Sequence, residues 1–264
     1  MAISLSDVSY RYPDGTLAVD SVDLEIAAGE RVAIVGQNGA GKTTAVKMMN
    51  GLLRPTSGEV RVDGESTAKR TTAQVSRDVG YVFQNPDDQI FGSDVQGELE
   101  FVAKRSGWDE GTRDERVRRA AVLAGLGNVM ELNPNDLPFA VKKFVAIGAI
   151  LVGRCRYLIL DEPTAGLDGR GRRLLTRMID LLQQEGIGII TITHDMRFVA
   201  DRFERVVAMA HRQVIANGDV HDVFADRAVM HEARLRRPEA ALLSQDLGLD
   251  PRALSIDEIA ALIP

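Results

Sequence analysis

The chain contains almost no cysteine: Cys155 is the only one among its 264 residues. A single cysteine cannot form an internal disulfide, so the sequence excludes a small scaffold held together by disulfides. Cys155 lies in an apolar stretch, and the sequence shows no sign of a catalytic thiol. This cysteine usage fits a reducing cytosol.

Long apolar runs are also missing. The longest, residues 144–153, has about ten residues, whereas a membrane-spanning helix needs roughly twenty. The N-terminal sequence MAISLSDVSYRY lacks the basic and apolar regions of a secretory signal. We therefore expect a chain that does not cross a bilayer, and this leaves open its docking onto a protein that does.

An excess of positive charge is the third absence. The 32 Lys and Arg residues are outnumbered by 38 Asp and Glu residues, which gives a net charge of −6. A protein without a basic field is poorly suited to nucleic acid, so we predict no nucleic-acid partner. The hydrophobic content of 45% is ordinary for a globular protein, and the length allows one large domain or two small ones.

What the chain does contain is a glycine-rich stretch directly after an apolar run, residues 32–35. The stretch consists of Gly36, Gln37, Asn38, Gly39, Ala40, Gly41, Lys42 and Thr43, and Thr44 follows it. The pattern GxxxxGK[ST] between a strand and a helix is typical of a nucleotide phosphate-binding loop. Glycines let backbone N–H groups approach phosphate oxygens, Lys42 offers a positive charge, and the Thr43 hydroxyl can bind Mg²⁺. Taken alone, the stretch also fits an ordinary glycine turn.

A second motif follows another apolar run, residues 157–160. Asp161 and Glu162 come directly after it, which places two carboxylates at the C-terminal edge of a buried strand. Asp161 can then hold Mg²⁺ through water, and Glu162 can act as the general base for an attacking water. The alternative is a helix N-cap followed by an acid in the first helical turn.

Three further residues are candidates because of their positions beside predicted strands. Gln84 follows the strand at residues 79–83 and is a candidate water or metal contact. His194 follows the strand at 187–193 and can hydrogen-bond a γ-phosphate, although a histidine there is more often structural. Tyr12 precedes a Pro-Asp-Gly turn, where stacking on adenine and an ordinary strand aromatic are equally compatible with its spacing.

The remaining pattern predicts an α/β fold with a mixed sheet. The predicted strands cover residues 4–10, 18–26, 32–35, 59–62, 79–83, 157–160, 187–193, 203–209 and 213–216. Helical spacing from about residue 94 to 153 indicates a helical subdomain inserted into the sheet domain. We expect an ATPase domain at residues 1–218 and a helical extension at 219–264, which either contacts a dimer partner or packs on the chain's own sheet.

With these pieces in order, the sequence resembles the nucleotide-binding subunit of an ATP-binding cassette (ABC) transporter. The resemblance covers roughly residues 3–218 and is carried by residues 36–43, by Gln84, by LILDEPTAGLD at residues 158–168 and by His194. The segments YRYPDGT, GLLRPTSGEVRVDG and VFQNPDDQIF resemble the ATPases of energy-coupling factor transporters, which import vitamins and transition metals such as cobalt and nickel.

The resemblance implies a Mg-dependent ATPase with a phosphate-loop NTPase fold and with ATP and Mg²⁺ as cofactors. It implies that Tyr12 stacks on adenine, that Gln84 marks the loop sensing a membrane subunit, and that Asp168 ends a loop reaching the dimer partner. The implied partners are a second ATPase, a transmembrane coupling subunit and a substrate-binding membrane subunit. The implied location is peripheral, on the cytoplasmic face of the cell membrane.

One segment departs from the family pattern. Where family members carry the signature LSGGQ at the start of a helix, this chain has Leu137, Pro138, Phe139, Ala140 and Val141. Proline has no N–H or hydroxyl to offer, and the side chains of Phe139 and Ala140 block the close approach that glycine allows. The helix itself is still expected, over residues 141–152, with Pro138 at a first helical position.

Because each ATP in this family lies between one subunit's phosphate loop and the other's signature, a homodimer would have two defective sites. The sequence therefore predicts a heterodimer with an ATPase that carries an intact signature. A regulatory or structural subunit with little hydrolysis of its own is the alternative. A soluble ATPase acting on DNA or ribosomes is disfavoured by the acidic composition.

Overall fold

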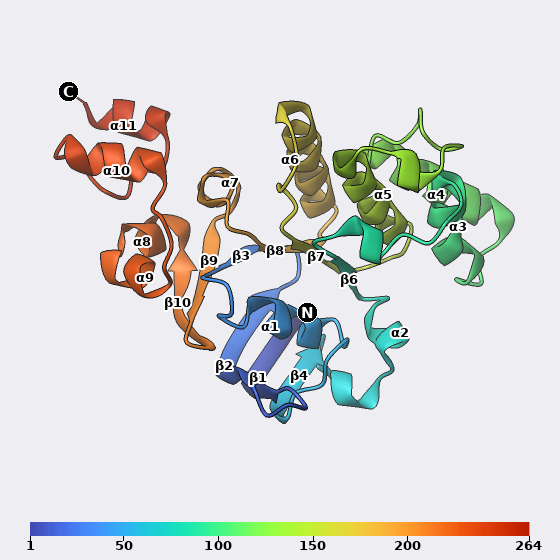
Figure 1. Ribbon diagram of the computed structural model, residues 1–264, viewed down its shortest axis with the longest axis horizontal. Coiled ribbons are helices and arrows are strands. Elements are labelled where there is room, and N and C mark those ends of the chain that lie inside the picture. Colours follow the sequence, from blue (N-terminus) through green and yellow to red (C-terminus); the bar gives the residue numbers. More distant parts are fainter. Residues whose placement is uncertain (264) are drawn as a thin grey trace.

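A computed structural model describes residues 1–263, and Figure 1 shows two β-sheets with helices packed around them. The smaller, antiparallel sheet contains β1 (Ala2–Arg11), β2 (Leu17–Ala27), β4 (Ser57–Val62) and β5 (Glu65–Ser66), in the order β2-β1-β4-β5. In the β1–β2 pair, Ile3 lies opposite Ile26 and Leu5 opposite Leu24, and all four are buried. Alternating apolar residues thus give this sheet one core face, as the sequence predicts.

The larger sheet has the order β10-β9-β3-β8-β7-β6. Its strands are β3 (Arg31–Val35), β6 (Val79–Val82), β7 (Tyr157–Asp161), β8 (Gly188–Ile192), β9 (Arg205–Ala210) and β10 (Gln213–Asp219). All neighbouring strands are parallel except β9 and β10, which are antiparallel. Every residue of β7 and β8 is buried, as expected for parallel strands covered on both faces.

The last two strands of the larger sheet differ from their predicted bounds. β10 does not end at Ala216 but continues through Asn217 and Gly218, which lie opposite Val207 and Val206 of β9. An edge strand needs a partner on one side only, and the Asn217 side chain accepts a hydrogen bond from Arg205 Nε at 2.8 Å. β9 begins at Arg205 because Phe203 ends the preceding helix and packs edge-on against Phe198.

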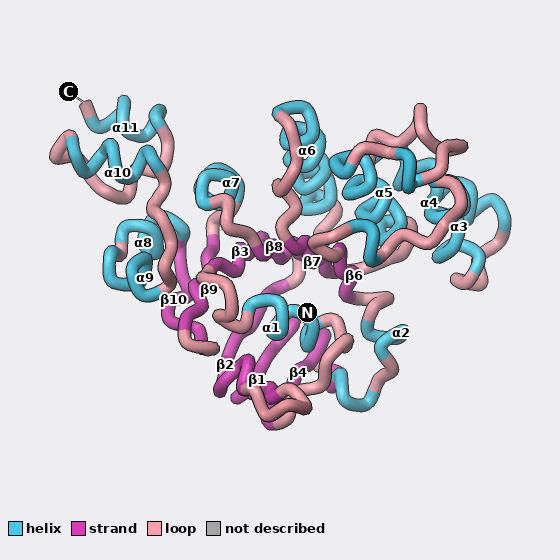
Figure 2. Tube along the Cα trace, in the orientation of Figure 1, coloured by secondary structure: helices cyan, strands magenta, loops and turns pink. Residues whose placement is uncertain are grey.

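The helices form two groups around the sheets. The predicted inserted subdomain is a lobe beside the β6–β7 end of the larger sheet in Figures 1 and 2, made of α3 (Val95–Lys104), α4 (Glu110–Leu123) and α5 (Phe139–Leu151). The other helices before the C-terminal extension are α1 (Lys42–Met49), α2 (Thr72–Val75), α6 (Gly169–Gln184) and α7 (Met196–Arg202), with short 3₁₀ turns at Thr67–Lys69, Pro86–Asp88 and Pro134–Asp136. Within residues 1–263, none of the helices is long and apolar enough to cross a membrane.

Strand β3 lies between two hydrophobic cores, and its alternating side chains reach both. Val32 and Ile34 join a core with α1 and the smaller sheet, whereas Ala33 and Val35 join a core with α5 and α6. Helix α1 therefore packs between the two sheets. Because β3 and α1 are both packed in these cores, both ends of the loop that connects them are fixed.

The C-terminal extension contains α8 (Val220–Ala225), α9 (Arg227–Glu232), α10 (Glu239–Asp246) and α11 (Ile256–Leu262). Val220 and Phe224 of α8 are buried in the core beside β9, so this helix packs on the chain's own sheet. Figure 1 places α10 and α11 on the side of the molecule opposite to the α3–α5 lobe. Buried Arg237 ties the extension together, because it donates to Phe224 O at 2.9 Å, to Gln245 Oε1 at 2.7 Å and to Pro251 O at 3.1 Å.

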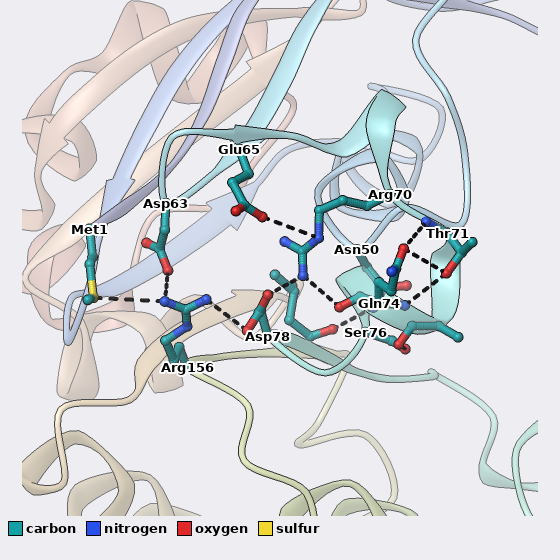
Figure 3. Close-up of polar contacts among 12 residues, drawn as sticks. Met1, Asn50, Asp63, Glu65, Arg70, Thr71, Gln74, Ser76, Asp78 and Arg156 are labelled. Carbon is teal, nitrogen blue, oxygen red and sulfur yellow. Dashed lines mark hydrogen bonds and ion pairs between the residues drawn. The ribbon is translucent and has the colours of Figure 1, made fainter. Parts of the chain in front are cut away.

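A polar network joins the two sheets at the N-terminal ends of the parallel strands (Figure 3). Arg156, directly before β7, pairs with Asp63 of the β4–β5 turn and with Asp78, at 2.8 Å from Asp78 Oδ1. Arg70 pairs with the other oxygen of Asp78. Burial alone would raise the pKa of Asp78, but the two guanidinium groups outweigh it and lower this pKa. The network thus lies at the edge of the sheet opposite to the C-terminal ends of the parallel strands.

Candidate functional site

The candidate residues gather where three neighbouring parallel strands end. The phosphate loop, residues 36–43, follows β3; Asp161 ends β7; and His194 follows β8, which lies between β3 and β7. Parallel strands bring their C-terminal ends to one edge of the sheet, and ligands of α/β proteins bind there. The strand order therefore brings the phosphate loop to two segments that follow it by more than a hundred residues in the sequence.

Two glycines of the phosphate loop lie against backbone of other strands. Gly36 has a φ of 145°, and a Cβ on it would lie 2.1 Å from Met209 O of β9. Gly41 has a φ of 98°, and its Cβ would lie 2.5 Å from Ala18 O of β2. Gly41 is also the N-cap of α1, so the helix N-terminus opens directly onto the loop.

Replacing Gly36 with Ala is expected to disrupt the loop, because the added methyl group would overlap a backbone oxygen that cannot move away. Gly39 provides a matched control: its φ is 79°, but a Cβ on it would meet no atom within 4 Å. Gly39→Ala should therefore cost only the left-handed strain of about 1–2 kcal/mol. Urea unfolding and ATP binding of the two variants check this, and equal losses would contradict it.

Lys42 turns its side chain back over the loop. Its Nζ donates to Gly36 O at 2.6 Å and to Gln37 O at 2.9 Å. Burial lowers the pKa of Lys42, and the nearby Glu162 and Asp161 carboxylates oppose that shift. The ammonium group is thus held at the centre of the loop. Thr43, the next residue, is exposed in the first turn of α1.

Asp161 is buried at the end of β7 and accepts a hydrogen bond from the Tyr81 hydroxyl, with 2.8 Å to its Oδ2. Burial raises the pKa of Asp161, although the Tyr81 hydroxyl and nearby lysines favour the charged form. Sequence reasoning missed Tyr81. The available signal was a tyrosine inside a fully apolar strand, since a buried hydroxyl usually has a hydrogen-bond partner.

Glu162 has a left-handed backbone with a φ of 47°, which is uncommon for a residue with a side chain. Its N–H donates to Ile192 O at 2.8 Å. Its Oε2 accepts from the Thr193 hydroxyl at 3.0 Å and from the His194 N–H at 3.3 Å. The strained backbone and these contacts fix the carboxylate on the site side of the sheet.

His194 lies across the site from Glu162. Its Nε2 is 3.0 Å from Asn38 Oδ1 of the phosphate loop and 3.7 Å from Glu162 Oε1. The side chain is 45% exposed, so it is not a satisfied core histidine. The structure thus brings together Lys42, Asp161, Glu162 and His194, as the sequence predicts.

Tyr12 and Gln84 are both exposed to solvent. The Tyr12 hydroxyl is 3.1 Å from Thr44 Oγ1, and its ring packs edge-on against Tyr10 while 38% of the residue stays exposed. Gln84 is exposed after β6. In the same loop, Gln89 rather than Gln84 closes the turn, because its Oε1 accepts from the Phe83 N–H at 3.0 Å.

Residues 137–141 form the predicted helix start, with one correction. Pro138 is the N-cap of α5 and not its first helical residue, because its ψ of 146° is extended; α5 begins at Phe139. Phe139 is 43% exposed, and its ring lies 3.1 Å from where a Cβ on Gly166 would be. Asp168, at the end of the same loop, caps α6 by accepting from the Gly171 N–H at 2.7 Å.

Cys155 is buried in contact distance of Gly80, and burial raises the pKa of its thiol to about 11. At neutral pH it is therefore protonated, which agrees with the absence of catalytic-thiol signals in the sequence.

A phosphate loop on one buried strand, with two acids and a histidine at the ends of its neighbours, defines an ATPase of the phosphate-loop class. The family model for the ABC transporter matches residues 19–165. The chain belongs to the ABC transporter family, as one of its ATP-hydrolysing subunits.

Similar proteins include an energy-coupling factor ATPase and two ABC transporter cassettes of known structure. The chain is 37% identical over 241 residues to the energy-coupling factor transporter ATP-binding protein EcfA of Methanothermobacter thermautotrophicus, covering 90% of this chain and 78% of the relative. It superposes on cbiO1 of Clostridium perfringens, part of the ABC transporter complex cbiONQ, with a TM-score of 0.78 and 34% identity over 92% of this chain and 98% of that one. The dimeric structure of the ATP-binding cassette MJ0796 bound to ADP and Pi superposes with a TM-score of 0.75 and 25% identity. The match covers 83% of this chain and 98% of MJ0796.

Proposed function

We propose that this chain is the ATP-hydrolysing energy-coupling subunit of a vitamin or transition-metal importer, bound to the cytoplasmic face of the membrane. We further propose that it works as one half of a nucleotide-sandwich heterodimer. One observation carries the proposal: the side chains needed for hydrolysis meet at a single edge of the sheet, whereas the start of α5 presents Pro138 and Phe139 where a phosphate-binding signature belongs.

Each residue of the site has a proposed role in binding Mg-ATP. Residues 36–44 hold the phosphates, with Lys42 as the central charge, and Tyr12 stacks on the adenine. Thr43, Gln84 and Asp161 hold Mg²⁺, which when bound neutralises charge on the phosphates. The fit is supported by Asp161, since its carboxylate uses one oxygen on Tyr81 and retains acceptor capacity for a metal-bound water.

The chemical step in this proposal depends on Glu162 and His194. Glu162 accepts a proton from the attacking water, and the contacts from Thr193 and the His194 N–H hold its carboxylate in place. The Nε2 of His194, 3.0 Å from Asn38 Oδ1 of the phosphate loop, would hydrogen-bond a γ-phosphate oxygen when ATP is bound. Closure of the dimer on ATP and its reopening after hydrolysis would then drive the membrane subunits.

The heterodimer follows from the chemistry of α5. In a dimer that sandwiches ATP, each signature completes the other subunit's site, and the similar cassette MJ0796 forms a dimer that binds ADP and Pi. Pro138 lacks an N–H, and Phe139, the first residue of α5, carries a bulky, partly exposed side chain where the signature has glycine. Losing one preorganised donor typically lowers a rate by about 10²–10³, so the site completed by this chain should be slow.

Isolation of the complex tests this composition. The tagged full-length chain, extracted with its membrane in detergent, is expected to carry one equivalent of a second ATPase with an intact LSGGQ signature, along with membrane subunits. Mass spectrometry of the intact complex gives the stoichiometry. A complex with two copies of this chain and no second ATPase would contradict the heterodimer.

A further inference from the structure

A buried lysine on α5 contacts the backbone of Glu162, directly after β7. Lys143 is 3% exposed, and its Nζ donates a hydrogen bond to the backbone carbonyl of Glu162. Burial lowers the pKa of Lys143, and the Glu162 and Asp161 carboxylates oppose that shift. Burying an ammonium group is costly unless it is paired or hydrogen-bonded. The Glu162 carbonyl offsets part of that cost by accepting the hydrogen bond from Lys143 Nζ.

The carbonyl that Lys143 binds belongs to the strained residue of the site. Glu162 has a φ of 47°, a left-handed conformation that is strained for a residue with a side chain. Such a backbone persists only where surrounding contacts fix it. Ile192 O accepts from the Glu162 N–H, and the Glu162 C=O accepts from Lys143 Nζ and, at 3.3 Å, from the Ala165 N–H. These contacts fix the peptide groups on both sides of this Cα, and Lys143 supplies the one side-chain donor among them.

Phe139 links this lysine to the surface of the molecule. It lies one turn before Lys143 on the same face of α5, and its ring centroid is 5.4 Å from Lys143 Nζ. The same ring packs against Gly166 in the loop after Glu162. The exposed start of α5, the lysine and the Glu162 peptide therefore form one continuous set of contacts.

The neighbouring lysine has different contacts. Lys142 Nζ is 2.8 Å from Asp87 Oδ1, in the loop after β6, and makes its ion pair away from Glu162. The two lysines are adjacent in sequence and equal in charge. Removing either lysine takes one positive charge from α5, but only the loss of Lys143 removes the contact with Glu162. Comparing the two variants therefore separates the effect of this contact from the effect of charge.

We propose that Lys143 is a positioning residue for hydrolysis: its hydrogen bond to the Glu162 carbonyl holds the left-handed peptide that aims the Glu162 carboxylate at the attacking water. The proposal rests on the proposed role of Glu162 as general base. It also makes α5 an internal support of this chain's own site, independent of what its N-terminus offers to a partner.

The test compares Lys143→Met with Lys142→Met in the full-length chain, assembled in the complex with which it purifies. Methionine keeps the apolar stem and removes the donor. For Lys143→Met, kcat for Mg-ATP is expected to fall by about 100-fold, as for a small misplacement of a catalytic group, with KM unchanged within a factor of two. Lys142→Met should keep wild-type kcat, and Lys143→Arg, which retains a donor, should recover part of the loss.

A crystal structure of Lys143→Met supplies a readout that does not depend on catalysis. The proposal requires that the Glu162 peptide leaves its left-handed conformation and that kcat falls. An unchanged peptide, with or without a lower kcat, overturns it, and so does a turned peptide with wild-type kcat. If Lys143→Met does not fold, Lys143→Leu, which also lacks a donor, is judged by the same two results.

Failure of this proposal is distinguishable from failure of the proposed function. Wild-type turnover in Glu162→Gln removes Glu162 as the base, whatever Lys143 does. Loss of turnover in Glu162→Gln, combined with wild-type turnover in Lys143→Met, leaves the function intact and overturns only the positioning role.

Discussion

Replacing Glu162 with Gln in this chain alone is expected to lower ATP hydrolysis by the assembled complex by about 10²–10⁴-fold, which is the usual contribution of a general base. Glutamine keeps the shape of the side chain, and its amide oxygen can still accept from the Thr193 hydroxyl. It cannot take a proton from water. ATP affinity should therefore remain near wild type while turnover collapses.

The measurement is steady-state phosphate release by the purified complex, together with equilibrium binding of a fluorescent ATP analogue. Glu115→Gln, at an exposed position on α4, is the matched control and should leave both values unchanged. Turnover that persists in Glu162→Gln would place the chemistry on the partner's phosphate loop. This chain would then be the regulatory half of the pair.

The convergence of the site could be predicted because its parts follow buried strands. Gly36, Asp161 and His194 each come directly after an apolar run, and the C-terminal ends of parallel strands share an edge. The glycines were predictable for the same local reason, and the 2.1 Å separation between a Cβ on Gly36 and Met209 O shows what that glycine avoids. The order of the strands was not predictable, since neighbours in the sheet are far apart in sequence.

The supporting side chains escaped prediction because their partners are distant. Tyr81 binds Asp161 across 80 positions and Lys143 binds Glu162 across 19. A tyrosine in an apolar strand signals that a partner exists, but no local pattern says which residue that partner is. The strand was wrongly predicted to end before Asn217-Gly218. These two residues favour turns, but here they pair with Val207 and Val206 of β9, and this pairing outweighs their local preference. Local chemistry thus identified the groups that meet at the edge of the sheet but not the side chains that hold them there.

Restoring the signature with the changes Pro138→Ser, Phe139→Gly, Ala140→Gly and Val141→Gln is expected to activate the slow site. The clearest background is a complex whose own site already carries Glu162→Gln, because the second site is then observed alone. Turnover should rise by about 10²–10³-fold over that background, since a hydroxyl and backbone N–H groups become available to the transition state. Phosphate release under the same conditions measures it.

The restored signature also removes the Phe139 ring, which contacts residues of this chain's own site. Removing it uncovers Gly166 and one side of Lys143, so any gain at the second site must be separated from a change in the loop after Glu162. Phe139→Ala alone removes the ring without supplying glycine or hydroxyl groups, and it should leave the second site slow. If Phe139→Ala activates the complex as much as the full restoration does, steric blockage and not the missing donors limits the site. If neither variant changes turnover, residues 137–141 do not complete a nucleotide site, and the proposed asymmetric heterodimer is contradicted.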